Sequence, residues 1–193
     1  MTRRIPPHLE EIYPRPLVEA RLAALAAIVD SWTSTPRDSS HPPLLAVCIL
    51  RGGVFFFSDL LQRMTTSVEP AFCRAWSYTK GMNGMTEAEV RLDWHGTSLA
   101  GRDILLIDNI CDSGRTLDVA WNHALKAGAR SVRSVTMVQR QRADAVHSPT
   151  ATGFIYDGPE WLVGYGLRDG EARSNLPSVY RVIANPVQPL ATV

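Results

Sequence analysis

A short polar segment that follows an apolar run is the part of this sequence best suited to chemistry. Asp108 and Asn109 come directly after the run Asp103–Ile107, and a polar pentapeptide then leads into a region of helical periodicity. Such a turn offers backbone N–H groups, hydroxyls and the positive end of a helix dipole to one point, which is what a phosphate needs. Gly114 would let the backbone approach the anion closely. The pentapeptide consists of Asp112, Ser113, Gly114, Arg115 and Thr116.

The residues next to this segment limit which class of ligand it can bind. An acid and an amide beside a phosphate cradle suit a ligand that is both phosphorylated and rich in hydroxyls. A sugar phosphate fits better than a nucleoside triphosphate, because neither GxxxxGK[ST] nor GxGxxG occurs. The plain alternative is that Asp112 and Ser113 only cap a helix, a position that both residue types favour.

The apolar runs of the sequence predict the strands that position this segment. Leu44–Leu50 and Asp103–Ile107 are continuous apolar stretches of strand length, as expected for strands buried on both faces of a parallel sheet. Helical segments are expected at Val54–Met64 and Thr116–Ala127, and a third strand at Ser131–Val138. Two consecutive strand–helix–strand units predict an α/β fold with a doubly wound, mostly parallel sheet and ligands at the carboxyl ends of its strands.

Composition excludes several classes of protein. A chain of 193 residues suits one domain, and its formal net charge of +1 argues against coating nucleic acid or an anionic membrane. No apolar run approaches the ~18 to 20 residues that span a bilayer, and no apolar signal core follows the first residues, so we expect a cytoplasmic protein without a membrane partner. The three cysteines lack metal-binding spacing, which favours reduced thiols and no zinc site.

The segment 104–117, ILLIDNICDSGRTL, resembles the diagnostic segment of the type I phosphoribosyltransferases. In that family four apolar residues precede two acids, two apolar residues and Asp-(Thr/Ser)-Gly-x-Thr. The resemblance covers most of the chain and is strongest to the hypoxanthine-guanine branch, through LLAVCILRGGVFFFSDLL at 44–61 and LVGYGLRD at 162–169. It implies a single domain over 1–193, with a core at about 40–140 and a small hood built from the N-terminal segment and about 150–185.

The resemblance also implies an activity. The family transfers ribose 5-phosphate from phosphoribosyl pyrophosphate to hypoxanthine or guanine in purine salvage, releases pyrophosphate, uses Mg²⁺, and is usually a homodimer or homotetramer. One alternative is transfer to a different base. Another is a non-catalytic regulator that binds phosphoribosyl pyrophosphate or a nucleotide together with RNA, although the near-neutral charge makes nucleic acid an unlikely partner.

Roles follow from matching positions in the phosphoribosyl half of the site. The resemblance implies that Asp108 and Asn109 meet the ribose hydroxyls and that residues 112–116 hold the 5′-phosphate. Asp108 would also hold Mg²⁺, largely through substrate and water. Asp112 would lie near the purine N7 and act as the general base. Asn109 replaces an acid of the family, so one negative charge is lost.

Further roles concern pyrophosphate and loop closure. Arg51 and Gly52 match a turn, often cis, that binds pyrophosphate, and Arg173 would add positive charge there. Ser77 and Tyr78 match the start of a mobile loop that closes over the reaction centre. The plain alternatives are an ordinary strand-to-helix turn, a solvated arginine and packing at a strand end.

The base half of the site departs from the family. Gln139 stands within Val-Gln-Arg where the family typically has Val-Lys-Arg, and that lysine hydrogen-bonds the purine 6-oxo group. A neutral amide can donate a hydrogen bond but supplies no charge. Trp161 could stack on the base or pack in the core. The sequence therefore leaves open which base is accepted.

Overall fold

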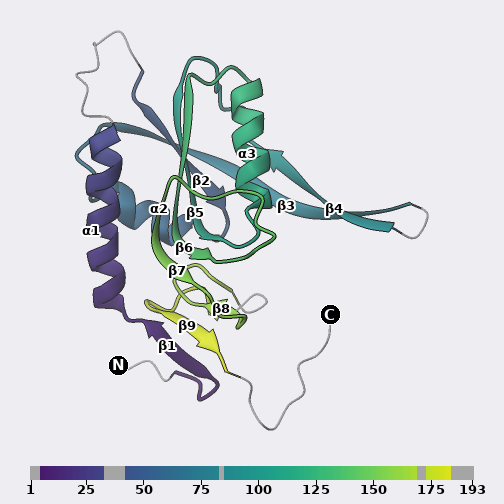
Figure 1. Ribbon diagram of the computed structural model, residues 1–193. Coiled ribbons are helices and arrows are strands. Elements are labelled where there is room, and N and C mark those ends of the chain that lie inside the picture. Colours follow the sequence, from purple (N-terminus) through teal and green to yellow (C-terminus); the bar gives the residue numbers. More distant parts are fainter. Residues whose placement is uncertain (1–4, 33–41, 83–84, 169–172, 184–193) are drawn as a thin grey trace.

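The computed structural model describes residues 5–32, 42–82, 85–168 and 173–183, with side chains omitted for 78–88 (Figure 1). It contains three helices and nine strands in these ranges. In chain order they are β1 (Leu9–Tyr13), α1 (Arg15–Trp32), β2 (Leu44–Leu50), α2 (Val54–Leu61), β3 (Val68–Met82), β4 (Met85–Asp93), β5 (Asp103–Cys111), α3 (Arg115–Lys126), β6 (Ser131–Arg140), β7 (Ala151–Tyr156), β8 (Leu162–Val163) and β9 (Val179–Val182). None of the described helices is long and apolar enough to cross a membrane.

The central sheet has six strands in the order β4-β3-β2-β5-β6-β7. All neighbouring pairs are parallel except β3 and β4, which are antiparallel at one edge. The two apolar runs recognised in the sequence, β2 and β5, lie side by side in the middle, with Leu45 opposite Ile104 and Cys48 opposite Ile107. The predicted mostly parallel α/β sheet is confirmed.

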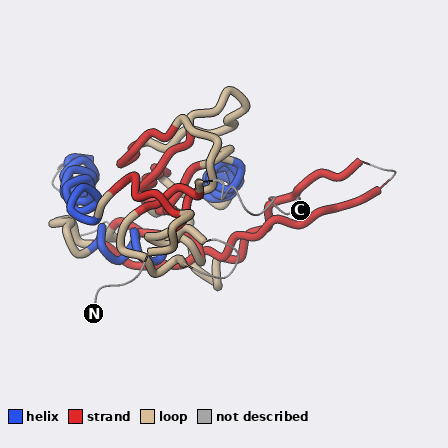
Figure 2. Tube along the Cα trace, turned by 90° about the horizontal axis from the view of Figure 1, so that it is seen from below, coloured by secondary structure: helices blue, strands red, loops and turns tan. Residues whose placement is uncertain are grey.

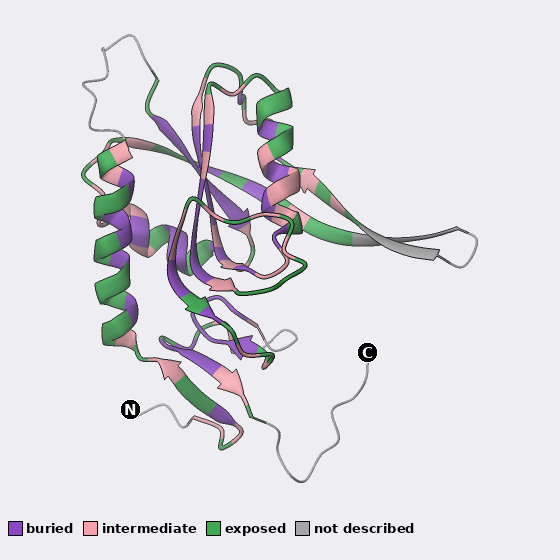
Figure 3. Cartoon of the chain, in the orientation of Figure 1, coloured by how far each residue is buried: buried purple, intermediate pink, exposed green. Residues whose placement is uncertain are grey.

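Both faces of the sheet are covered, which explains why its central strands are apolar throughout. Successive side chains of a strand point to opposite faces. In β2, Ala46 and Cys48 pack in the cluster that includes α1 and α2, whereas Leu45 and Val47 pack in the cluster that includes α3. Figure 3 shows the resulting burial along the middle of the sheet.

The β3–β4 hairpin corrects one expectation. We expected a loop to begin at Ser77 and Tyr78, but the backbone ladder continues from Arg74 opposite Asp93 to Met82 opposite Met85. The hairpin extends away from the rest of the chain (Figure 2).

A second, three-stranded antiparallel sheet has the order β1-β9-β8 and therefore joins segments from both ends of the described chain. Leu9 pairs with Val182, and Val163 pairs with Tyr180. Its small core includes Leu9, Val163, Leu176 and Tyr180. This sheet lies below the central sheet in Figure 1, on the side where the residues after β2, β5 and β6 come together.

Candidate active site

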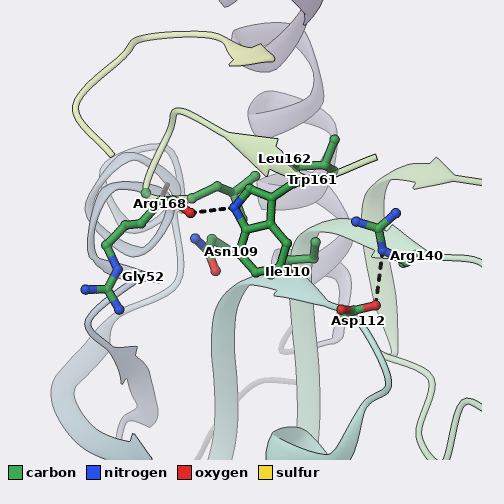
Figure 4. Close-up of a pocket in the computed structure, with 10 residues that line it drawn as sticks. Gly52, Asn109, Ile110, Asp112, Arg140, Trp161, Leu162 and Arg168 are labelled. Atoms are coloured by element: carbon green, nitrogen blue, oxygen red, sulfur yellow. Dashed lines mark hydrogen bonds and ion pairs between the residues drawn. The ribbon is translucent and has the colours of Figure 1, made fainter. Parts of the chain in front are cut away.

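A cavity of about 330 Å³ lies between the carboxyl ends of the central strands and the segment around β8 (Figure 4). Parallel strands bring their carboxyl ends to one edge, so residues far apart in sequence converge there. Six of the lining residues carry the argument below: Gly52, Asn109, Asp112, Arg140, Trp161 and Arg168.

One end of the cavity holds an ion pair. Arg140 Nε lies 3.1 Å from Asp112 Oδ1, and Arg142 Nη1 lies 3.4 Å from the same oxygen. Arg140 is itself fixed, because it donates to the carbonyl oxygens of Gly158 and Glu160. A carboxylate acceptor and a guanidinium donor are thus held side by side at the cavity wall.

The helix-cap alternative for Asp112 and Ser113 is wrong. The N-cap of α3 is Gly114, with φ +82°, and Asp112 directs its carboxylate to Arg140 instead. The polar pentapeptide lines a second hollow of about 200 Å³ at the start of α3. The residues of that hollow include Asp108, Asp112, Ser113, Gly114, Arg115 and Thr116. The structure therefore brings together the residues that the sequence assigned to one phosphate cradle.

Asp108 lines the second hollow, and its neighbour Asn109 lines the cavity. The backbone N–H of Asn109 donates to Asp108 Oδ1 at 2.8 Å. Asn109 is 5% exposed, and its amide lies so close to Gly52 that a Cβ there would be 2.8 Å from Nδ2. Burial raises the pKa of Asp108 to about 7, so its charge changes near neutral pH.

The opposite end of the cavity combines Gly52 and Arg168. Figure 4 shows the Arg168 side chain extending toward Gly52, with Trp161 and Asn109 between it and the Asp112–Arg140 pair. Trp161 Nε1 donates to the Arg168 carbonyl oxygen at 2.7 Å. Because Trp161 is 60% exposed and lines the cavity, its interpretation as a core residue is wrong.

The Arg51–Gly52 turn connects β2 to α2. The peptide bond between Leu50 and Arg51 is cis, the form that the resemblance implies for this turn. Arg51 is exposed, whereas Gly52 lines the cavity. The backbone of the turn touches the segment after β8, since a Cβ on Gly166 would lie 2.1 Å from the Gly52 oxygen.

Several residues singled out in the sequence do not line the cavity. Arg173 is half-buried with φ +66°, and its carbonyl oxygen accepts from the Leu176 N–H. Ser77 is exposed inside β3; the backbone of Tyr78 pairs with Glu89, and its side chain lies outside the described atoms. Gln139 donates from Nε2 to Ser148 Oγ at 3.4 Å.

Sequence reasoning missed Arg140 and Arg168 as cavity residues. Gln139 and Arg140 are consecutive in β6, so their side chains point to opposite faces and only one of them can face the cavity. That residue is Arg140, which carries the positive charge that Gln139 lacks. The signal was present in Val-Gln-Arg, but strand alternation alone does not say which member faces inward.

The oxygen donors near the cradle suit a loosely held magnesium ion. Among the described residues no group of three or more His, Cys, Asp or Glu is arranged to hold a metal. The Asp108 carboxylate and the Asn109 amide oxygen are hard oxygen donors at the cavity edge. Mg²⁺ prefers such donors but keeps several waters and substrate oxygens in its coordination shell, so the residues present fit this ion.

Comparisons with known proteins agree with this geometry. Residues 8–169 match the family model "Phosphoribosyl transferase domain". A hypoxanthine-guanine phosphoribosyltransferase of Streptococcus thermophilus is 35% identical over 144 residues, which are 74% of this chain and 79% of that protein. A hypoxanthine phosphoribosyltransferase structure from Staphylococcus aureus superposes with a TM-score of 0.78 at 26% identity, covering 91% of this chain and 92% of that one.

Another relative is much longer. The bifunctional protein TilS/HprT of Listeria monocytogenes is 35% identical over 147 residues, which are 76% of this chain. The matched region spans only 22% of that bifunctional protein.

Proposed function

This chain belongs to the phosphoribosyl transferase family, and on that premise we propose that it transfers ribose 5-phosphate from phosphoribosyl pyrophosphate to hypoxanthine or guanine, in purine salvage. The observation that carries this proposal is the Asp112–Arg140 pair at the cavity wall, next to the hollow formed by residues 112–116. The relatives named for this activity support it.

The pair is complementary to one edge of a 6-oxopurine. Hypoxanthine and guanine can present an N7–H donor and an O6 acceptor side by side. Asp112 accepts from the first and Arg140 donates to the second, which binds the base by two charge-assisted hydrogen bonds. Adenine places an amino donor where Arg140 needs an acceptor, so the site disfavours a 6-aminopurine.

Asp112 is also placed to take a proton. Both arginine contacts involve Oδ1, which leaves Oδ2 with no partner among the described residues. In the proposed reaction the purine N9 lone pair bonds to C1′ of the ribose while the bond from C1′ to pyrophosphate breaks. The N7 proton passes to Asp112, so the nucleotide forms as a neutral base.

The remaining residues bind and orient the substrates. The backbone N–H groups at the start of α3 hold the 5′-phosphate, and Asp108 with Asn109 meets the ribose hydroxyls. Trp161 covers one face of the base, and Arg168 with the Gly52 turn offsets the negative charge that develops on pyrophosphate. Asp108 and Asn109, with substrate oxygens and water, would hold Mg²⁺, which would supply positive charge to the pyrophosphate.

The organisation of the chain is proposed to follow the same family. We take residues 1–193 as one domain whose small sheet is the hood over the cavity. Exposed Phe55 in α2 and Phe72 and Trp76 in β3 favour burial in a homodimer or homotetramer, which light scattering after size-exclusion chromatography would measure. Three buried, unpaired cysteines suit a reducing compartment such as the cytoplasm.

The decisive experiment follows nucleotide formation from phosphoribosyl pyrophosphate and Mg²⁺ with hypoxanthine, guanine, xanthine, adenine and uracil. We expect product with hypoxanthine and guanine, and at least ~100-fold lower kcat/KM with adenine. Asp112→Asn is expected to lower kcat by roughly 10²-fold while phosphoribosyl pyrophosphate still binds. Product only with another base would overturn the substrate assignment, and binding without product from any base would identify a regulator.

A further inference from the structure

The segment Arg142–His147, which we call the strap, lies between β6 and β7 and crosses the loop that begins α3. It contacts that loop through side chains and through backbone. The contacted residues are Cys111, Asp112, Ser113 and Gly114. These four residues include the proposed general base, Asp112, and three of the five residues of the proposed phosphate cradle.

The side-chain contact is made by Arg142. Its Nη1 lies 3.4 Å from Asp112 Oδ1, the oxygen that also faces Arg140. The same guanidinium donates to both carboxylate oxygens of Asp144, at 2.8 Å each. A bidentate pair fixes the plane of a guanidinium, so Asp144 orients Arg142 toward Asp112.

The backbone contacts hold the loop from its other side. The Val146 N–H donates to the backbone carbonyl oxygen of Ser113 at 2.9 Å, and Cys111 Sγ lies 3.5 Å from the carbonyl oxygen of His147. At Gly114 the strap is so close that a Cβ would lie 2.6 Å from the His147 oxygen. Gly114 is therefore required both by its φ of +82° and by the strap.

His147 anchors the strap to the rest of the domain. Its Nε2 lies 3.3 Å from Ser134 Oγ on β6, and its ring centroid lies 5.3 Å from that of Trp121 on α3. Elements on either side of the loop thus fix one end of the strap. The other end continues directly from Arg140, which is held by Gly158 and Glu160.

We propose that the strap is a positioning device for catalysis, in which Arg142 aims the Asp112 carboxylate and the Val146 N–H fixes the phosphate-binding turn. Its catalytic consequence rests on the proposed function, whereas its effect on the loop does not. A surface loop with only a connecting role does not require contacts with four consecutive residues at the end of β5 and in the loop that follows it. The Arg142 side-chain contact and the Val146 backbone hydrogen bond therefore predict separable effects. Loss of the first should slow the chemical step, and loss of the second should weaken phosphate binding.

A double-mutant cycle tests the Arg142 anchor. We expect Arg142→Met to lower kcat about tenfold with the KM for phosphoribosyl pyrophosphate little changed, because only the aim of Asp112 is affected. In the Asp112→Asn background the same substitution should cause no further loss. Arg130→Met is the matched control, since Arg130 forms a similar pair with Asp103 outside both hollows. Additive losses, or an equal loss in the control, would overturn the role of Arg142.

Hydrogen–deuterium exchange tests the backbone anchor without relying on activity. Val146→Pro removes the N–H that donates to Ser113, whereas Val146→Ala retains it. With both variants folded by circular dichroism, we expect faster exchange in residues 111–117 only for the proline variant, together with a raised KM for phosphoribosyl pyrophosphate. Unchanged exchange in an active enzyme would refute the strap alone. Faster exchange in a protein that makes no nucleotide would support the strap and refute the proposed function.

Discussion

Arg140 Nε lies 3.1 Å from Asp112 Oδ1, and this pair connects the end of β6 to the loop that begins α3. The pair places a donor at the end of β6 beside an acceptor that directly follows β5, the parallel neighbour of β6. Arg140 lines the cavity and is positively charged, so the cavity keeps a cationic hydrogen-bond donor although Gln139 stands where the family has a lysine.

Arg140→Met should therefore lower kcat/KM for hypoxanthine by roughly 10²-fold, because the 6-oxo group loses a charged donor and Asp112 loses its main partner. Arg140→Lys should retain more activity than Arg140→Met. The ratio of hypoxanthine to adenine activity should fall in the methionine variant. Gln139→Ala is the control, and it should leave both activities near wild type because Gln139 does not line the cavity. A stronger effect at Gln139 than at Arg140 would reverse the assignment.

The parallel core could be predicted from the sequence because the composition of each segment by itself indicates a buried strand or a turn. Buried strands such as β2 and β5 must be apolar on both faces, and a glycine turn before a helix has a distinctive composition. The base pocket was harder to predict, since whether Gln139 or Arg140 faces inward depends on the register of β6 in the finished sheet. Arg168 was missed for a similar reason: only the folded segment after β8 brings it to the same end of the cavity as Gly52.

Arg168→Ala should weaken binding of pyrophosphate, which we propose is bound and released at the Gly52 end of the cavity. A guanidinium beside a polyanion contributes about 1.5–3 kcal/mol, so we expect roughly a tenfold or larger rise in Kd. Isothermal titration with pyrophosphate, with and without Mg²⁺, measures this directly. Arg173→Ala serves as the comparison, because Arg173 does not line the cavity, and a larger effect there would restore the role first expected from the sequence.

Asp108 should make activity depend on pH near neutrality. With burial raising its pKa to about 7, the ionised fraction increases about tenfold between pH 6 and pH 8. In the proposed site the ionised carboxylate accepts hydrogen bonds from the ribose hydroxyls and attracts Mg²⁺. The kcat/KM for phosphoribosyl pyrophosphate should therefore rise between pH 6 and pH 8. Asp108→Asn should have a lower value and lack this component of the pH profile. A rise of equal size in the variant would assign the titration to another group.

The Asp108 carboxyl should also lower the free energy of unfolding as the pH increases. Its pKa is raised in the folded state, so between its ordinary value and about 7 the folded chain binds more protons than the unfolded chain. The free energy of unfolding contributed by Asp108 therefore falls as pH rises through this window. Urea unfolding at pH 5 and pH 8 should show a smaller pH-dependent loss for Asp108→Asn than for wild type. An equal loss would mean that the carboxyl titrates alike in both states.

Gly166→Ala should destabilise the contact between the segment after β8 and the turn after β2. Gly166 has φ +91°, and an added Cβ would lie 2.1 Å from the Gly52 oxygen, so neither the backbone nor the neighbour can accept a side chain. We expect the free energy of unfolding to fall by about 2–4 kcal/mol, measured by urea denaturation. Gly101→Ala is the matched control: φ is +72° and nothing lies within 4 Å of its Cβ, so only the backbone penalty of about 1–2 kcal/mol applies. Equal losses in the two variants would mean that the close approach of Gly166 to Gly52 is not a feature of the folded protein.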